Sequence, residues 1–247
     1  QLDNITFLEI LKNNGACDLP CILGLKPGLT TRKSEEDFMS SLSSIDFIEH
    51  TRMENGSHLS ITLGEKEKQS IFLIDTYFSR EILEHITFTV YDTDGQSELL
   101  DGSLKNQYVP YFLLPKLLEK YGHPDKIWIA TWHPDKITKP VYDPATIVLC
   151  YAKKGFLIQY ISSSTINDKS ISVCPSNASI EITSWDPSVE LTLEEVLKNI
   201  SSSKYSMTNE MLDYFKEIDK ATSFTIDDFY FNFTNSNSSY CVDTSQD

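Results

Sequence analysis

Apolar residues recur every three or four positions at the start of the chain and then at every second position. The first spacing predicts a helix over residues 3–14 and a second helix after the turn at Pro27-Gly28. Between residues 46 and 91 apolar and polar residues alternate, as they do in strands that bury one face. Asn55-Gly56 separates two of these runs and favours a tight hairpin turn. The pattern predicts two helices followed by an antiparallel meander of four strands.

The same order of elements returns in the second half of the chain. A helix is predicted over residues 115–121, and Gly122 marks its end. Two further helices are predicted over residues 192–199 and 208–220, before an acidic tail. The strands predicted between these helices lie near residues 126–132, 145–152, 155–163 and 178–185.

Because a helix followed by a meander occurs twice, the predicted fold class is α+β. We expect two tandem helix-plus-antiparallel-sheet units with a helical C-terminal extension. Each helix is expected to bury its apolar stripe against its own sheet. The expected boundaries are 1–105 for the first helix/β-meander unit, 106–190 for the second, and 191–247 for the helical C-terminal extension and acidic tail.

The net charge of the chain limits the kinds of molecule that it is expected to bind. Among 247 residues, 36 are acidic and 21 basic, which gives a formal net charge of −15. A field of this sign repels phosphate backbones and anionic lipids, so we expect no binding to nucleic acid. No apolar run reaches the roughly 18–20 residues of a membrane-spanning helix. The expected partner is another protein or a second copy of the chain.

Five cysteines indicate the compartment. Cys150 lies in an apolar run that predicts a buried strand, so we interpret it as a free core thiol. The other four lie in polar or turn-rich surroundings that are typical of disulfides in exported proteins. The disulfide candidates are Cys17, Cys21, Cys174 and Cys241, and their three alternative pairings remain open. A zinc site at Cys17 and Cys21 is disfavoured, because no His or Cys follows at a finger-like spacing.

Glycosylation sequons also favour an exported protein. The composition predicts two or three Asn-x-Ser/Thr sequons by chance, and the chain has more. The candidates are Asn4, Asn55, Asn177, Asn199, Asn232 and Asn237. The alternative is that these are unmodified surface asparagines. The start at Gln1 fits a mature N-terminus after removal of a signal peptide, or a trimmed chain. We expect a secreted or cell-surface glycoprotein.

Candidate metal sites are few, and no catalytic motif is present. Asp92-Thr-Asp94-Gly95 offers two carboxylates to Ca²⁺, although Asp-Gly is also a common turn. His-Pro-Asp-Lys-Ile occurs at His123 and at His133, but a predicted strand separates these histidines by about 20 Å. Gly-x-Ser-x-Gly, His-Glu-x-x-His and a phosphate-binding glycine loop are absent from the sequence. We therefore expect no catalytic residue and no cofactor, with Ca²⁺ at Asp92 and Asp94 as the alternative.

An aromatic run near the C-terminus is the candidate interface. We interpret it as a terminal edge strand that pairs with another chain, because it is aromatic and carries little charge. Its candidate residues are Phe229, Tyr230, Phe231 and Phe233. The alternative is that these side chains belong to the core.

The segment from Cys17 to Thr31, CDLPCILGLKPGLTT, resembles a motif of uncharacterised bacterial secreted proteins and lipoproteins, Cys-x-x-Gly-x-x-Pro-Gly-x-Thr-Thr. LLEKYGHPD, from Leu117, and the paired strands from Ile147 to Tyr160 are similar to later parts of that family. The helix–meander repeat resembles the folds of the β-lactamase-inhibitor protein and of small outer-membrane assembly lipoproteins. These resemblances imply an exported protein that acts by binding other proteins, with a lipid anchor in a longer precursor of this chain as an alternative to free secretion.

These observations favour an exported, non-catalytic protein that binds other proteins or assembles with itself at a cell surface. One alternative is a secreted hydrolase or carbohydrate-acting enzyme whose acidic residues converge only in three dimensions. A second alternative, which the resemblance in fold implies, is a secreted enzyme inhibitor.

Overall fold

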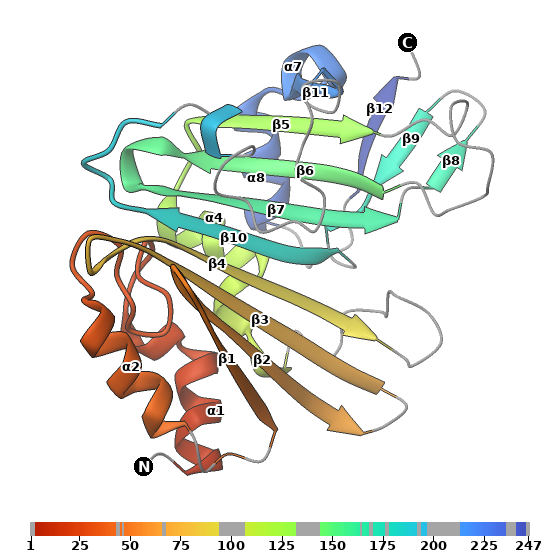
Figure 1. Ribbon diagram of the computed structural model, residues 1–247. Coiled ribbons are helices and arrows are strands. Elements are labelled where there is room, and N and C mark those ends of the chain that lie inside the picture. Colours follow the sequence, from red (N-terminus) through yellow and green to blue (C-terminus); the bar gives the residue numbers. More distant parts are fainter. Residues whose placement is uncertain are drawn as a thin grey trace, which may run out of the picture.

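The computed structural model shows a fold in which one large sheet carries helices on one face (Figure 1). The described residues are 3–42, 45, 47–65, 68–93, 107–131, 144–163, 165–167, 170–175, 178–191, 194–196, 213–235 and 241–245.

The sheet is continuous and antiparallel throughout. In sheet order, its strands are β1 (Ile48–Met53), β2 (Gly56–Glu65), β3 (Lys68–Ser79), β4 (Ile82–Thr93), β10 (Ser179–Trp185), β7 (Phe156–Ser163), β6 (Pro144–Tyr151), β5 (Lys126–Thr131) and β11 (Phe215–Glu217). The strands expected between residues 46 and 91 are confirmed as β1 to β4.

The prediction of an α+β fold of two tandem units is wrong, because this single nine-stranded sheet makes the fold β-rich. The decisive strand is β10, whose Ile182 lies opposite Phe88 of β4 and opposite Ile158 of β7. Residues Ile180 to Trp185 are all buried. A strand buried on both faces and paired on both edges satisfies its backbone groups in the centre of a sheet, where it joins the two meanders.

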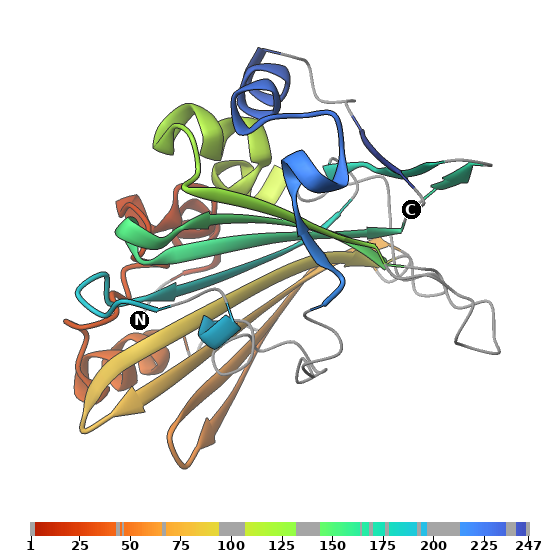
Figure 2. The same cartoon turned by 90° about the horizontal axis from the view of Figure 1, so that it is seen from above.

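The helices are short and pack mainly on one face of the sheet. They are α1 (Asn4–Lys12), α2 (Arg32–Ser41), α4 (Leu114–Tyr121), α7 (Ile218–Ala221) and α8 (Ile226–Asn235), with single turns at Asn14–Ala16, Pro110–Phe112 and Ala152–Lys154. Buried Thr76 of β3 donates its hydroxyl to Glu35 Oε1 of α2 over 3.2 Å. On the same face, Phe88 contacts Phe112 with ring centroids 4.9 Å apart. Figure 2 shows α4 and α8 together on one side of the sheet.

The core therefore divides into two parts. The main cluster fills the helix-covered face and includes Phe72, Ile74, Phe88 and Ile158, all with 0% of their surface exposed. A smaller cluster lies apart from it on the opposite face, over β5, β6, β7 and β10. We call it the second cluster, and its members are Trp128, Val148, Cys150, Leu157, Trp185 and Val196.

The expected disulfides are confirmed, and the structure selects one pairing. Cys17 is bonded to Cys21 and Cys174 to Cys241, while Cys150 is a buried free thiol. A small three-stranded sheet contains β8 (Thr165–Asn167), β9 (Ser170–Val173) and β12 (Val242–Ser245). The second disulfide links the end of β9 to the start of β12, so it ties the end of the chain to the body of the protein. Among the described residues, every helix is too short or too polar to cross a lipid bilayer.

The C-terminal part differs most from the sequence-based expectation. The predicted edge strand at residues 229–233 is wrong, because these residues form α8. Thr225 begins this helix: its hydroxyl accepts from the Asp228 backbone, and Asp228 Oδ2 accepts from the Thr225 backbone. Phe229 and Phe233 are four positions apart, so both side chains turn inward and contact each other at 4.4 Å between centroids. The predicted helix over 208–220 is correct only at its end, where residues 218–220 lie in α7; Phe215–Glu217 form strand β11 instead, and residues 208–212 lie outside the described ranges.

Candidate functional site

The face of β1, β2 and β3 that points away from α2 is only partly covered. Strand residues alternate between faces, and Thr76 points to α2, so Asp75 and Tyr77 lie on the opposite face. We call this surface the open band. Its residues are Glu49, Thr51 and Met53 of β1, His58, Ser60 and Thr62 of β2, and Ile71, Leu73, Asp75 and Tyr77 of β3. Each of them is half-buried or exposed.

The open band is acidic. Glu49 and Asp75 contribute carboxylates, and the band contains neither lysine nor arginine. The nearby Arg52 lies on the other face of β1, where its guanidinium pairs with Glu36 of α2 at 2.5 Å. The band therefore adds a local negative potential to the net charge of −15.

A histidine and a carboxylate pair in the middle of this band. His58 of β2 and Asp75 of β3 lie directly opposite each other in the strand pairing. His58 Nδ1 donates a hydrogen bond to Asp75 Oδ1 over 2.7 Å. The His58 side chain is 36% exposed and the Asp75 side chain 14% exposed.

Next to this pair, two rings stack. Tyr77 and His85 of β4 lie opposite each other with centroids 4.3 Å apart and ring planes 18° apart. Burial, followed by the negative charges of Asp75 and Glu181, raises the pKa of Tyr77. Burial lowers the pKa of His85 to about 4, so His85 is neutral at pH 7. Glu181 of β10 is itself buried and accepts a hydrogen bond from Gln159 Nε2 over 2.8 Å.

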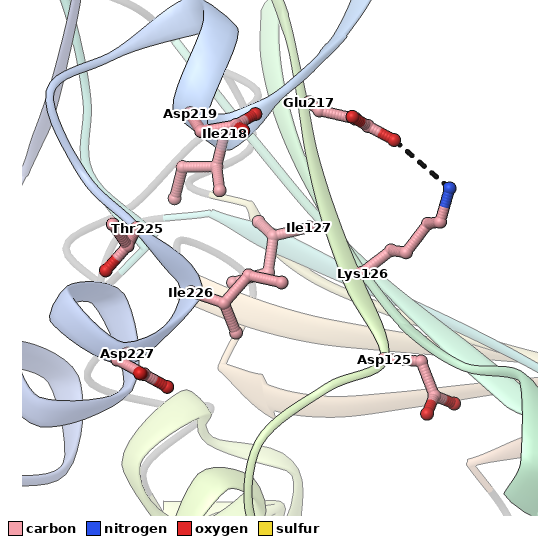
Figure 3. Close-up of a pocket in the computed structure, with 9 residues that line it drawn as sticks. All are labelled: Asp125, Lys126, Ile127, Glu217, Ile218, Asp219, Thr225, Ile226 and Asp227. Carbon is pink, nitrogen blue, oxygen red and sulfur yellow. Dashed lines mark hydrogen bonds and ion pairs between the residues drawn. The ribbon is translucent and has the colours of Figure 1, made fainter.

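A hollow of about 450 Å³ lies between β5, α7 and the start of α8 (Figure 3). Ile127, Ile218 and Ile226 occupy its middle, and Asp125 and Asp227 lie well apart at its edge. The remaining lining residues are Lys126, Glu217, Asp219 and Thr225.

The acidic residues of this hollow do not form a convergent pair. Glu217 is neutralised by Lys126 at 3.1 Å and by Lys220 at 2.9 Å, and these lysines lower its pKa. Across the described part of the chain, no three or more His, Cys, Asp or Glu side chains come together as metal ligands would. The hollow thus offers an apolar crease with isolated charges, and it does not offer a paired acid and base.

The candidate residues from the sequence are scattered over the molecule. Asn4 is exposed at the start of α1, and Asn55 is exposed at the turn between β1 and β2. Asn232 is half-buried in α8, where its Nδ2 donates to the Asp228 carbonyl. Asp92 lies in β4. Asn177, Asn199, Asn237, Asp94 and His133 lie outside the described residues.

The four aromatic interface candidates do not form one surface. Phe229 and Phe233 are buried in the core, whereas Phe231 is 66% exposed. Tyr230 stacks on His123 with centroids 3.9 Å apart, and His123 Nε2 lies 3.3 Å from Asp227 Oδ1. The helical spacing therefore divides this aromatic run between core and surface.

In comparisons with protein-family models, curated proteins and solved structures, nothing matches this chain. The resemblance to bacterial secreted proteins stays a prediction.

Proposed function

We propose that this is an exported, non-catalytic protein that binds a basic partner protein across the open band. The observation that carries the proposal is a half-exposed face in the body of the sheet that has carboxylates and no lysine or arginine. Charge complementarity across an interface steers encounter and disfavours partners of the same sign. Together with the net charge of −15, it favours a partner with a positive surface.

The shape and composition of the open band support a protein partner. Ile71, Leu73 and Tyr77 supply apolar and aromatic surface along β3, and Thr51, Ser60 and Thr62 supply hydrogen-bonding groups beside it on β1 and β2. Protein interfaces usually combine apolar and aromatic surface with hydrogen-bonding groups in this way. Strands lie about 4.8 Å apart, so a band three strands wide spans about 10 Å, which is broad enough to receive a segment of a partner protein.

Export is supported by the disulfides Cys17–Cys21 and Cys174–Cys241, because such bonds persist in oxidising compartments. Export also presents Asn4 and Asn55, the exposed sequon residues within the described ranges, to glycosylation. A cell-surface location and a lipid anchor in a longer precursor are parts of the same proposal.

A peptide selection tests the binding function. Random 12-residue peptides displayed on phage are selected on the native protein and then measured against two variants. Leu73→Arg places a positive charge in the open band, and Ile5→Arg makes the same type of change at a residue of α1 that is 77% exposed. We expect enriched peptides to be basic, to bind the Ile5→Arg variant normally, and to bind the Leu73→Arg variant at least about tenfold more weakly.

Two results would overturn the proposal. One is enrichment of peptides that bind the Leu73→Arg variant as well as the native protein. The other is a native dimer, measured by light scattering, that the Leu73→Arg change alone dissociates. That second result would assign the open band to a second copy of the chain.

A further inference from the structure

The strand β1 lies at one end of the sheet, and its outer edge has no neighbouring strand among the described residues (Figure 1). Residues 49–52 are all exposed although they alternate between the two faces, so this edge is open to solvent. The strand at the other end of the sheet, β11, has only three residues. By contrast β1 has six, in unbroken register with β2, and contains neither proline nor lysine, which commonly block pairing at an edge.

The pairing of β1 with β2 decides which backbone groups point outward. A two-residue turn joins these strands, and Met53 and Gly56 flank it, so these two residues exchange backbone hydrogen bonds. Hydrogen-bonded pairs recur at every second residue of an antiparallel ladder. The bond from the Thr62 backbone N–H to the Phe47 carbonyl, over 3.1 Å, follows the same spacing. The odd-numbered residues of β1 therefore bond to β2, and the even-numbered ones turn their N–H and carbonyl groups to the outer edge.

His50 and Arg52 each present one N–H and one carbonyl at this edge. The Ile48 carbonyl points the same way, whereas the Ile48 N–H donates to the Ile45 carbonyl over 3.2 Å. Within the described part of the chain, no backbone group bonds to the outward groups of His50 and Arg52. Donors and acceptors repeated at every second residue are the template on which an extended peptide adds to a sheet.

The side chains beside this edge belong to the open band. Glu49, Thr51 and Met53 lie on the open-band face of β1, so a strand added to β1 would place every second side chain next to them. In an antiparallel addition these are the positions without backbone hydrogen bonds, where opposing side chains lie closest. A lysine or arginine opposite Glu49 would form a favourable cross-strand pair with its carboxylate.

We propose that an extended segment of the partner protein adds to the outer edge of β1 as an antiparallel strand, with a lysine or arginine opposite Glu49. The inference rests on the proposed function and specifies how the basic partner meets the open band: the added strand continues that surface by one strand. A second copy of the chain is the weaker occupant. Each copy carries a net charge of −15, and pairing two β1 edges would bring two acidic open bands together.

A short peptide tests strand addition by NMR. The probe is acetyl-Val-Thr-Val-Thr-Lys-Thr-amide, which antiparallel pairing aligns with residues 53 to 48, so that its lysine lies opposite Glu49. We expect saturable shifts of the His50 and Arg52 amide signals. Hydrogen exchange of these two amides should slow at least about fivefold at saturation, because both become hydrogen-bonded. In the free protein they should exchange at least about tenfold faster than the amides of Glu49 and Thr51, which bond to β2.

Methylation of a single peptide nitrogen provides a matched control. The fourth peptide residue lies opposite His50, so its N–H points to β1, and a methyl group there removes that hydrogen bond and obstructs the edge. The third residue turns its N–H away from β1, so the same methyl group remains in solvent. We expect at least about a tenfold loss of affinity for methylation at the fourth residue and less than about a threefold loss at the third.

Charge reversal tests the position of the basic residue. Glu49→Lys reverses the charge beside the added strand, and Glu84→Lys makes the same change at an exposed residue of β4. We expect about a fivefold loss of peptide affinity for Glu49→Lys and no change for Glu84→Lys. A peptide with glutamate in place of lysine should bind Glu49→Lys more tightly than the native protein, which a loss of folding could not produce. The dispersion of each amide spectrum reports whether the variant is folded.

Equal affinities of the two N-methylated peptides would overturn the inference. So would the absence of saturable shifts at His50 and Arg52 with both the probe and the phage-selected peptides. Slow exchange of these amides in a free protein that is dimeric by light scattering would assign the edge to a second copy instead.

These outcomes are separable from failure of the proposed function. If the two N-methylated peptides bind alike while Leu73→Arg still weakens the selected peptides, the open band binds a basic partner without an added strand. If the selected peptides bind the Leu73→Arg variant as well as the native protein, the proposed function itself fails.

Discussion

The two halves of the sheet use the same face in opposite ways. One cross-strand row runs from Leu73 in β3 through Thr89, Glu181 and Gln159 to Val148 in β6. At the first end Leu73 is half-exposed in the open band, and at the other end Val148 is fully buried in the second cluster.

The difference arises from the chain that follows β10. Trp185 ends that strand and belongs to the second cluster, and Leu191 and Val196 pack against the same cluster. Within the described part of the chain, no apolar cluster of this kind lies over the open band. The hydrogen bond between Gln159 and Glu181 lies at the boundary. This face of the sheet is buried core over β5, β6 and β7 and accessible surface over β1, β2 and β3. It can combine stability with binding, because burial of one half stabilises the sheet whose other half is open to a partner.

The largest expected effect is a difference in stability between two leucine truncations. Leu157 of β7 is 0% exposed in the second cluster, and Leu73 of β3 is half-exposed. We expect Leu157→Ala to lower the free energy of unfolding by about 3 kcal/mol, because it removes buried methyl groups and leaves a cavity. Leu73→Ala should cost less than about 1 kcal/mol. Urea denaturation of both variants measures the two values, and equal losses would show that the halves are buried alike.

The pH dependence of the free energy of unfolding tests whether His85, between the two halves of the sheet, is shielded from water. His85 has a folded-state pKa of about 4, caused by burial, against about 6.5 in the unfolded chain. As the pH falls below about 6.5, the unfolded chain takes up a proton that the folded protein does not, so stability decreases. Between pH 7 and pH 5 this contribution is roughly 2 kcal/mol, which is present at the higher pH and lost toward the lower.

The His85→Gln variant isolates this contribution. It should lose roughly 2 kcal/mol less than the native protein between pH 7 and pH 5, as measured by urea denaturation at each pH. His123→Gln is the control, because the His123 side chain is 49% exposed. Identical pH profiles for the native protein and His85→Gln would show that His85 is accessible to water in the folded state.

Local structure could be predicted where one short stretch of sequence determines it. The alternation between residues 46 and 91 specifies β1 to β4, and Gly122 ends α4 as expected. The place of β10 could not be predicted in the same way, because its pairing with β4 depends on contacts between distant parts of the chain. The error at α8 is different: the spacing of Phe229 and Phe233 and the Thr225–Asp228 cap were both visible in the sequence.

Part of the candidate site could also be predicted from the sequence. The turn between β2 and β3 places Glu65 opposite Lys68, and counting back along both strands brings His58 opposite Asp75. The sequence does not specify whether another part of the chain covers that face. Coverage depends on where the chain after Trp185 packs, and two described residues of that stretch, Leu191 and Val196, lie over the β5–β7 half.

The accessibility of one thiol on each half tests the comparison with little effect on stability. Cys150 of β6 is a free thiol in the second cluster, and burial, followed by the charge of Asp125, raises its pKa to about 11. Ser60→Cys in the open band places a thiol on the same face of the other half, with a pKa near the usual value of about 8.5.

Only the thiolate reacts with iodoacetamide, so at pH 8 residue 60 should be labelled at least about 100-fold faster than Cys150. In 8 M urea the two rates should become equal within about threefold, because both thiols are then exposed. Rapid labelling of Cys150 in the folded protein would mean that the β5–β7 half is also open, and the contrast between a binding half and a supporting half would be lost.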